Sequence, residues 1–422
     1  MILLVYIEGL KEEVFIDEDL KLRIKNCPEE LITIITEMKD DNNKIFKSVN
    51  EYMPNNNEVN LDEQSPVKGD YYTADSNGIL WSMKEKAAGR KDYFEKNNEL
   101  PILVSLRVMA EGKVLYITDF KLIYYRKPVR KLEYSTSDRK GLLFEPKKGG
   151  EFPAVILLSG SDGGCKAESA AYLASHNFLV YALPYFNSEN LPKNLENIPL
   201  EYFKEATEYL KNHERCDGNV HLVGYSKGAE LALLLGSVYD DYKSIIAGAP
   251  GAYITSGMRE GVFAPVKSWT LDGVPLPYLK TRFSPSLIFK SFTNYFRNKP
   301  MSFLEIWTHS LKKSSKLKNI MIDVENISCP IMLISGADDQ LWPSSAFSEL
   351  IRTQRTHPKD IFLDFQDAGH FIAFPYSFVN IPVMSFMQSG KMTLNFGGND
   401  SSNVHAVRTA NPTIVDFLVG NS

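Results

Sequence analysis

The sequence predicts an α/β protein of two differently built domains: residues 1–128 as a β-sandwich and residues 129–422 as a doubly wound, mostly parallel sheet with helices. A chain of 422 residues exceeds the size of one ordinary domain. Short β-rich runs separated by turn residues fill the first part, whereas buried apolar runs alternate with helical stretches in the second. Strands that alternate with helices form parallel sheets with right-handed crossovers.

Short strands account for the whole N-terminal domain. Residues 20–24 alternate apolar and polar side chains, as a half-buried strand does, and residues 31–35, 102–108 and 114–118 are rich in β-forming residues. Turn-forming segments such as Asp75-Ser76-Asn77-Gly78 separate these runs. Because helical periodicity is nearly absent, we expect an immunoglobulin-like β-sandwich that serves either as a structural module or in shaping an active site.

Continuous apolar runs predict the strands of the second domain, because strands buried on both faces have no polar side. Residues 154–158 and 178–182 are such runs, and further strands are expected at residues 220–223, 244–247, 331–334 and 361–365. The helical stretches between them are residues 168–175, 202–210 and 229–235. The alternation stops between about residues 250 and 325, where aromatic and basic residues gather. We expect a lid-like insertion there, over the carboxyl edge of the sheet where α/β proteins bind ligands.

Composition excludes several classes of protein. Hydrophobic residues make up 44% and charged residues 23% of the chain, which is typical of a soluble globular protein. The net charge of -5 favours no nucleic acid. The four cysteines are widely scattered and form neither a CxxC pair nor a zinc-ligand pattern, so we expect no metal and a cytoplasmic protein with reduced thiols. Residues 1–6 are too short an apolar stretch for a signal peptide, and no run has the length of a membrane span.

The segment Gly224-Tyr225-Ser226-Lys227-Gly228 lies between a predicted strand and a predicted helix. A sharp strand-turn-helix forces close backbone approaches, which explains the glycine on either side. Ser226 would lie at the helix N-terminus, where backbone donors and the helix dipole favour a developing negative charge. The pattern alone is common by chance, but this position makes Ser226 the candidate nucleophile of an α/β-hydrolase fold.

A serine nucleophile needs a base, and in this fold the order along the chain is serine, acid, histidine. Three histidines come late enough: His357, His370 and His405. His370 follows the strand of residues 361–365, on a loop at the carboxyl edge of the sheet. His357 precedes that strand and should lie at the wrong end, and His405 lies in a polar region where a surface role is favoured. His370 is therefore the candidate base.

The acid is expected after the strand of residues 331–335, where Asp338 and Asp339 follow Gly336. Asp339 stands four residues before Pro343 and has the more usual placing for this fold. We predict Asp339 as the acid and Asp338 as a residue that caps the following turn.

An oxyanion hole needs two backbone N–H donors. The Lys227 N–H, directly after the nucleophile, is the first candidate. The second is expected from the glycine-rich loop of residues 159–164, at Ser161 or Asp162. This loop lacks the Gly-Lys-Ser/Thr sequence with which a phosphate-binding loop ends. A plain strand-to-helix connection is equally compatible with its composition.

Several spaced motifs occur together and in order. They are residues 77–83, 161–164, 182–187, 200–203, 224–231, 336–339, 368–370, 397–398 and 405–406. With them the chain resembles, over nearly its whole length, the acyl-CoA thioesterases related to bile acid-CoA:amino acid N-acyltransferase. The segment of about residues 250–325 does not match well, so the resemblance implies no acyl-chain specificity.

The resemblance implies a β-sandwich before an α/β-hydrolase domain, a catalytic triad of Ser226, Asp339 and His370, acyl-CoA thioesters as substrates and no cofactor. Members that conjugate amino acids carry a cysteine nucleophile, whereas this chain has serine. A serine ester normally passes its acyl group to water, so release of fatty acid and coenzyme A, in lipid metabolism, is the expected reaction.

Three other functions remain open at this point. A dienelactone hydrolase-like carboxylesterase would turn over simple oxygen esters equally well, and an acyl-CoA:amino acid N-acyltransferase would form conjugates. A non-catalytic acyl-CoA-binding protein would use the basic residues of the insertion on coenzyme A phosphates, although a solvated lid is the commoner outcome of such a composition. In each case the partner is a small-molecule acyl-CoA or ester, with neither nucleic acid nor a membrane span. No pattern indicates the oligomeric state.

Overall fold

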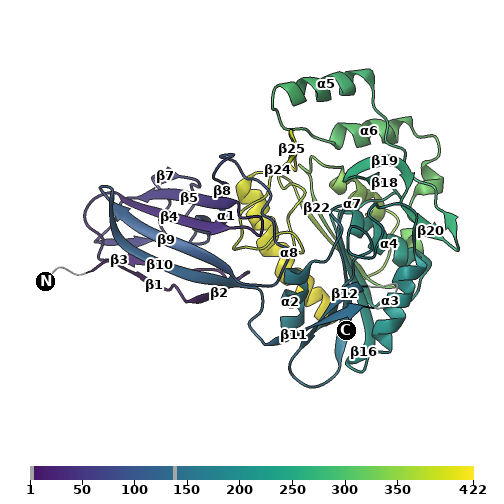
Figure 1. The fold of residues 1–422 in the computed structure, drawn as a ribbon, viewed down its shortest axis with the longest axis horizontal. Coiled ribbons are helices and arrows are strands. Elements are labelled where there is room, and N and C mark those ends of the chain that lie inside the picture. Colours follow the sequence, from purple (N-terminus) through teal and green to yellow (C-terminus); the bar gives the residue numbers. More distant parts are fainter. Residues whose placement is uncertain (1–3, 136–139) are drawn as a thin grey trace. The chain divides into compact units, whose positions relative to one another are not determined.

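The computed structural model describes residues 4–135 and 140–422, which form two compact units (Figure 1). The first unit contains the described residues up to Arg126 together with Ser377–Gln388, and the second contains Lys127–Tyr376 and Ser389–Ser422. The predicted junction lies at residue 128, and no sequence pattern pointed to the later return of the chain. Residues 1–3, part of the N-terminal stretch considered above, lie outside the described residues.

The first unit is built from two β-sheets, as a β-sandwich requires. One sheet contains β1 (Tyr6–Glu8), β3 (Arg23–Lys25) and β6 (Glu58–Asn60). The other contains, in order, β2 (Glu13–Phe15), β10 (Lys113–Ile123), β9 (Ile102–Ala110), β4 (Ile32–Lys39), β5 (Ile45–Tyr52) and β7 (Lys68–Gly69), with β8 (Lys84–Glu85) beside β5. Strands β4, β5 and β9 bury alternate residues, because only one face of the sheet meets the core. The predicted β-sandwich is confirmed, although the strand expected at residues 20–24 begins only at Arg23.

Segment Ser377–Gln388 is fastened to the first unit through Asn380. Its buried side-chain amide donates to the carbonyl oxygens of Phe15 (3.0 Å) and Glu18 (2.9 Å), and its oxygen accepts from Asn77 Nδ2 at 2.6 Å. Asn77 precedes the short, fully buried helix α1 (Gly78–Trp81). The motif at residues 77–83 therefore holds a returning piece of chain, a role that local patterns do not encode.

The second unit contains an eight-stranded sheet. Its order is β11 (Val129–Ser135), β12 (Lys140–Pro146), β14 (Leu179–Ala182), β13 (Phe152–Leu158), β16 (Cys216–Tyr225), β17 (Ser244–Gly248), β22 (Ile331–Gly336) and β23 (Ile361–Phe365). The strands from β14 to β23 are parallel, and the edge hairpin β11–β12 is antiparallel. The predicted mostly parallel α/β-hydrolase sheet is confirmed, while the edge hairpin was not predicted.

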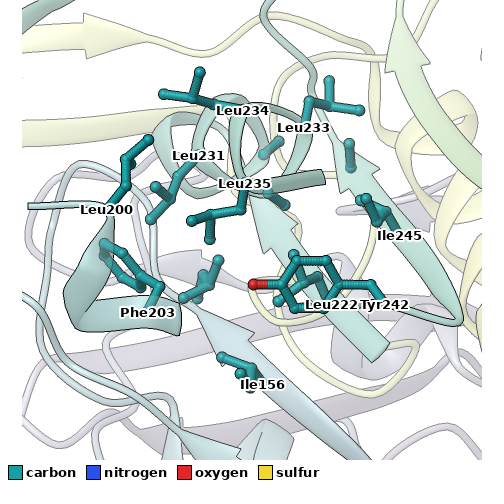
Figure 2. Close-up of a cluster of buried hydrophobic side chains, with 14 of the residues drawn as sticks. Ile156, Leu200, Phe203, Leu222, Leu231, Leu233, Leu234, Leu235, Tyr242 and Ile245 are labelled. Atoms are coloured by element: carbon teal, nitrogen blue, oxygen red, sulfur yellow. The ribbon is translucent and has the colours of Figure 1, made fainter. Parts of the chain in front are cut away.

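Helix α4 packs its apolar side chains on the middle of this sheet. The helices of the unit outside the insertion are α2 (Ala167–Ser175), α3 (Glu201–Lys211), α4 (Lys227–Val238), α7 (Ser344–Arg352) and α8 (Asp400–Gly420). Every residue of α4 from Lys227 to Gly236 is buried. Figure 2 shows Leu231, Leu233 and Leu235 of α4 in one cluster with Leu222 of β16. The segment that follows Ser226 is therefore anchored in the core along most of its length.

Between β17 and β22 lies the insertion expected at about residues 250–325. It contains β18 (Ser256–Arg259), β19 (Val262–Lys267), β20 (Trp269–Leu271), β21 (Val274–Pro275), α5 (Pro285–Phe296), α6 (Leu304–Lys313) and the 3₁₀ turns η1 (Leu317–Ile320) and η2 (Val324–Asn326). Strand β20 also pairs with β15 (Ile198–Pro199), and β24 (Phe386–Ser389) and β25 (Met392–Asn395) precede α8. Figure 1 shows α5 on the outside of the insertion, beyond α6. Within the ranges that the structure describes, no helix is long and apolar enough to cross a membrane.

Candidate active site

Ser226 stands at a strained turn between β16 and α4. Its φ of 54° lies in the left-handed region that residues other than glycine rarely adopt. The Ser226 N–H donates to Gly248 O at 2.7 Å, which helps to hold the turn. A Cβ on Gly224 would lie 2.1 Å from Gly228 O, and one on Gly228 would lie 2.3 Å from Ser159 O. Both flanking glycines are therefore required by close backbone contacts, as the sequence pattern indicated.

The structure brings His370 and Asp339 together. His370 Nδ1 lies 2.8 Å from Asp339 Oδ2, and the two side chains are 0% and 1% exposed. The other carboxylate oxygen accepts from the N–H groups of Leu341 (2.9 Å) and Trp342 (3.2 Å). The carboxylate thus holds the Nδ1 edge of the imidazole and is itself oriented by the backbone that follows it.

Asp338 points elsewhere. One of its oxygens accepts from Gln340 Nε2 at 2.7 Å and the other from the Gly398 N–H at 2.8 Å. Gly397 pairs with Asp339, and Phe396 O accepts from the His370 N–H at 2.9 Å. The glycine pair of the motif at residues 397–398 therefore holds the loops that carry Asp339 and His370.

The second imidazole nitrogen, His370 Nε2, is buried and has no hydrogen-bond partner among the described residues. A buried polar atom in this state usually has a functional or solvent partner. The rings of Trp342, Phe371 and Phe396 surround the imidazole. A hydrogen bond from Ser226 to Nε2 is not formed here, and in enzymes without substrate such bonds are often long until substrate binds.

Tyr225 ties the loop of His370 to the turn of Ser226. Its hydroxyl donates to His370 O at 2.5 Å and accepts from the Ile372 N–H at 2.9 Å. The ring is fully buried, and burial raises the pKa of its phenol, so the hydroxyl stays protonated and keeps donating. The residue directly before Ser226 therefore positions the loop of the histidine.

The two other candidate histidines, His357 and His405, lie elsewhere in the unit. His357 Nδ1 accepts from the Lys359 N–H at 3.2 Å, within its own turn before β23. His405 is exposed on α8, where its ring lies 6.0 Å from that of Phe365.

The glycine-rich loop after β13 lies next to Ser226: a Cβ on Gly160 would be 3.5 Å from Ser226 Cβ. The Gly160 N–H is already bonded to Tyr376 Oη at 2.7 Å. Tyr376 Oη in turn donates to Asp162 Oδ1 at 2.5 Å. Of the amides in this loop, those of Ser161 and Asp162 are the ones predicted as oxyanion donors.

Two motifs of the sequence meet around this loop. Tyr185 Oη donates to Ser159 O at 2.8 Å, and Asn187 Nδ2 donates to Asp162 O at 2.9 Å. The side chain of Asp162 also pairs with Lys166 Nζ at 2.6 Å. Tyr376, Tyr185 and Asn187 thus fix the loop conformation. The motif at residues 182–187 was a sequence signal for Tyr185 and Asn187, and no sequence signal pointed to Tyr376.

A buried polar network follows Ser226. Lys227 Nζ donates to Glu230 Oε1 (2.7 Å), to Thr255 Oγ1 (2.7 Å) and to Thr255 O (3.0 Å). Glu230 also accepts from Trp269 Nε1 at 2.9 Å and from the Thr255 N–H at 3.1 Å. All four side chains are fully buried, and this burial lowers the pKa of Lys227. The network bonds helix α4 to the start of the insertion.

No group of three or more His, Cys, Asp or Glu side chains in residues 4–135 and 140–422 is arranged to hold a metal ion. The four cysteines are free thiols. Cys165 lies in the glycine-rich loop region, and burial raises its pKa to about 12, which makes its sulfur a poor nucleophile at neutral pH.

Comparisons with known proteins agree with this architecture. The family described as "BAAT / Acyl-CoA thioester hydrolase C terminal" matches residues 198–420, and "Acyl-CoA thioester hydrolase/BAAT N-terminal region" matches residues 17–135. Acyl-coenzyme A thioesterase 6 of Homo sapiens is 26% identical over 372 residues, covering 85% of this chain and 83% of that protein.

Two relatives from Mus musculus are similar at the same level. The mitochondrial acyl-coenzyme A thioesterase 2 is 26% identical over 403 residues, covering 93% of this chain and 83% of the relative. The peroxisomal succinyl-coenzyme A thioesterase is 25% identical over 371 residues, covering 85% and 83%. Since one family description matches more than half of the chain and the other matches its N-terminal domain, the chain belongs to the acyl-CoA thioester hydrolase/BAAT family.

Proposed function

We propose that this protein hydrolyses acyl-CoA thioesters to a fatty acid and coenzyme A, with Ser226 as nucleophile, His370 as base and Asp339 as acid. One observation carries the proposal: a buried His370–Asp339 pair presents an unpartnered Nε2, on a loop that Tyr225 ties to the strained turn of Ser226. The names of the relatives, which are acyl-coenzyme A thioesterases, support the choice of substrate.

The first half of the reaction acylates the serine. His370 Nε2 takes the proton of Ser226 Oγ as the oxygen attacks the thioester carbonyl carbon, and Asp339 stabilises the imidazolium that forms. The carbon–sulfur bond then breaks, and coenzyme A leaves as its thiol after taking the proton from His370. The acyl group remains as an ester on Ser226.

The second half releases the acid. Water gives a proton to His370 and attacks the ester, and the fatty acid leaves as Ser226 Oγ regains its proton. Both tetrahedral intermediates carry an oxyanion, for which we propose the N–H of Lys227 and that of Ser161 or Asp162 as donors. Lys227 is the first residue of α4, so its N–H has no acceptor within the helix.

A serine rather than a cysteine at residue 226 favours transfer of the acyl group to water over its transfer to an amino acid. A serine ester is less reactive toward amines than a cysteine thioester. We also retain the cytoplasmic location and a role in fatty acid metabolism as predictions. Cell fractionation tests the location, because two relatives are named as mitochondrial and peroxisomal.

A panel of acyl-CoA chain lengths, with release of free thiol as readout, tests the proposal. Ser226→Ala should lower kcat by a factor on the order of 10⁵, and Asp339→Asn by a factor on the order of 10⁴ because the imidazole tautomer is lost. His405→Ala, at an exposed histidine, serves as the matched control. Absence of turnover with every chain length, or full activity of Ser226→Ala, would contradict the proposal. Equal turnover of simple oxygen esters would point to a carboxylesterase instead, and conjugates formed with added glycine or taurine to an acyltransferase.

A further inference from the structure

The insertion contains a strongly basic pocket of about 510 Å³, a volume typical of small-molecule sites. Four basic side chains line it: Lys267, Lys280, Arg282 and Lys316. No acidic side chain lines it, and none of these four cations forms an ion pair with a residue that the structure describes. Concentrated, uncompensated positive charge of this kind attracts a ligand with several negative charges.

The same pocket offers apolar surface to a flat ring. Tyr278 and the prolines Pro275 and Pro277 line it beside the cations. Phosphate groups match the fork of an arginine and the point charge of a lysine, and a heteroaromatic base stacks on an aromatic side chain. The lining therefore fits a phosphorylated nucleotide better than a simple inorganic anion.

The pocket walls are bonded to the network that follows Ser226. The Leu279 N–H, next to Lys280, donates to Ile254 O at 2.7 Å. Ser268 Oγ, next to Lys267, donates to Thr255 O at 2.8 Å. Thr255 is itself bonded to Lys227 Nζ, so a short chain of contacts leads from the pocket to the nucleophile turn.

We propose that this pocket binds the adenosine 3′-phosphate and diphosphate of coenzyme A. The inference rests on the proposed function and deepens it, because it assigns the part of the substrate that does not react. The pantetheine arm separates the nucleotide of coenzyme A from its thioester, so the nucleotide site of such an enzyme lies apart from its nucleophile.

The test compares an acyl-CoA with the N-acetylcysteamine thioester of the same acid, which has no phosphate. For the wild type, kcat/KM should be higher for the acyl-CoA. In Lys280→Glu/Arg282→Glu the ratio of the kcat/KM for the acyl-CoA to that for the N-acetylcysteamine thioester should fall about tenfold or more, since two charge-assisted contacts are lost. The fall should come from a higher KM for the acyl-CoA. Lys312→Glu, at an exposed lysine of α6 outside the pocket, should keep the wild-type ratio.

Failures of the two proposals are distinguishable. If the wild type hydrolyses neither thioester, the proposed function falls. If it hydrolyses both with equal kcat/KM, or if the double variant loses both activities in proportion, the pocket does not bind the nucleotide and hydrolysis stands. Binding of adenosine 3′,5′-bisphosphate to the wild type and its loss in the double variant would support the assignment independently.

A second and separate observation concerns helix α5. Ile288, Phe289, Phe292, Tyr295 and Phe296 recur at the spacing of one helical face, and none of the residues of α5 is buried. The exposed fractions of these side chains run from 37% to 70%. An apolar stripe of this size on a helix surface marks an interaction site.

The charge around the stripe is one-sided. Between Asp272 and Glu305 the chain has no acidic residue, whereas it has five basic ones, in a protein whose net charge is -5. Those basic residues are Lys280, Arg282, Lys290, Arg297 and Lys299; the first two also line the basic pocket, and Lys290 pairs with Glu305 of α6. A helix with an aromatic face and basic flanks has the composition of one that lies in the surface of an anionic membrane.

We infer that α5 docks this protein on anionic lipid surfaces without spanning them. Co-sedimentation tests this with vesicles of phosphatidylcholine alone and vesicles that also contain phosphatidylserine. The wild type should bind the anionic vesicles, less tightly as salt rises. Phe289→Ser/Phe292→Ser should weaken that binding about tenfold or more, and Leu103→Ser, at an exposed leucine of β9, should not.

Three outcomes would overturn this inference. One is no binding by the wild type at low salt, and another is equal binding to both kinds of vesicle. The third is a dimer in size-exclusion chromatography that Phe289→Ser/Phe292→Ser converts to a monomer, because the stripe would then face a second copy of the chain.

Discussion

Helices α4 and α5 have the same length of 12 residues and opposite surroundings. In α4 the first ten residues are buried, and in α5 none is. Both are rich in large apolar side chains, so composition does not separate them. The difference teaches that the leucines of α4 stabilise the fold, whereas the aromatic residues of α5 add little to it and are better explained by what they bind.

Each helix also carries one lysine–glutamate pair. Lys227 and Glu230 are 1% and 0% exposed and lie 2.7 Å apart, while Lys290 of α5 pairs with Glu305 of α6 at 57% and 49% exposure. Water screens the exposed pair, whereas each charge of the buried pair depends on its partner. The pairs therefore offer a matched test of how far the two regions differ.

The largest expected effect is that of Glu230→Gln. It leaves the buried charge of Lys227 without its partner, and we expect the free energy of unfolding of the second unit to fall by about 3–5 kcal/mol. Glu305→Gln in the exposed pair should cost about 0–1 kcal/mol. Denaturant unfolding measures both. Similar losses of unfolding free energy in the two variants would contradict the contrast between α4 and α5.

Core truncation should give a somewhat smaller contrast. Leu233→Ala removes a fully buried side chain of α4 and should cost about 2–5 kcal/mol, because the cavity closes only in part. Phe289→Ala on α5 removes a larger side chain that is 70% exposed, and the change should stay within about 0.5 kcal/mol. The same unfolding measurement applies. A large loss for Phe289→Ala would mean that α5 belongs to the fold rather than to a partner.

The sheet beneath α4 should also make stability depend on pH. Burial lowers the pKa of His221 to about 4, and His221 bonds to Ser244 Oγ at 2.8 Å. Above pH 6.5 the histidine is neutral in both states, so it contributes no pH dependence there. Between pH 6.5 and 4 the unfolded chain takes up a proton that the folded chain refuses, and stability should fall by about 3 kcal/mol. His221→Asn should flatten this part of the pH profile, and the exposed-site variant His405→Asn should not.

The parts of the fold that could be predicted are those in which a local pattern and a tertiary role coincide. Strand β23 has the predicted bounds of residues 361–365, because a short β-rich run between turn-forming segments marks it even at the edge of the sheet. The turn of Ser226 was recognisable because the backbone contacts of Gly224 and Gly228 exclude any side chain. Hairpin β11–β12 was not predicted, since its strands mix charged and apolar residues.

The contacts that could not be predicted join residues far apart in the chain. Tyr376 binds the loop at Gly160, and Asn380 returns to the first unit, through packing that no local pattern encodes. The helix α5 was also missed, although its apolar residues recur at helical spacing. Its basic and aromatic composition does not distinguish a surface helix from a loop.

The smallest expected effect tests whether α5 opens independently of α4. Ser284 caps α5, and its Oγ accepts from the Leu287 N–H at 3.2 Å. Ser284→Ala should destabilise this helix by about 1 kcal/mol. Because α5 buries no residue, the cap holds only the helix, and the global unfolding midpoint should not move. Hydrogen exchange should therefore show faster exchange confined to the amides of α5, while those of α4 keep their protection. If the amides of both helices lost protection together, α5 would unfold with the core, and its exposed stripe would need a structural explanation instead of a binding one.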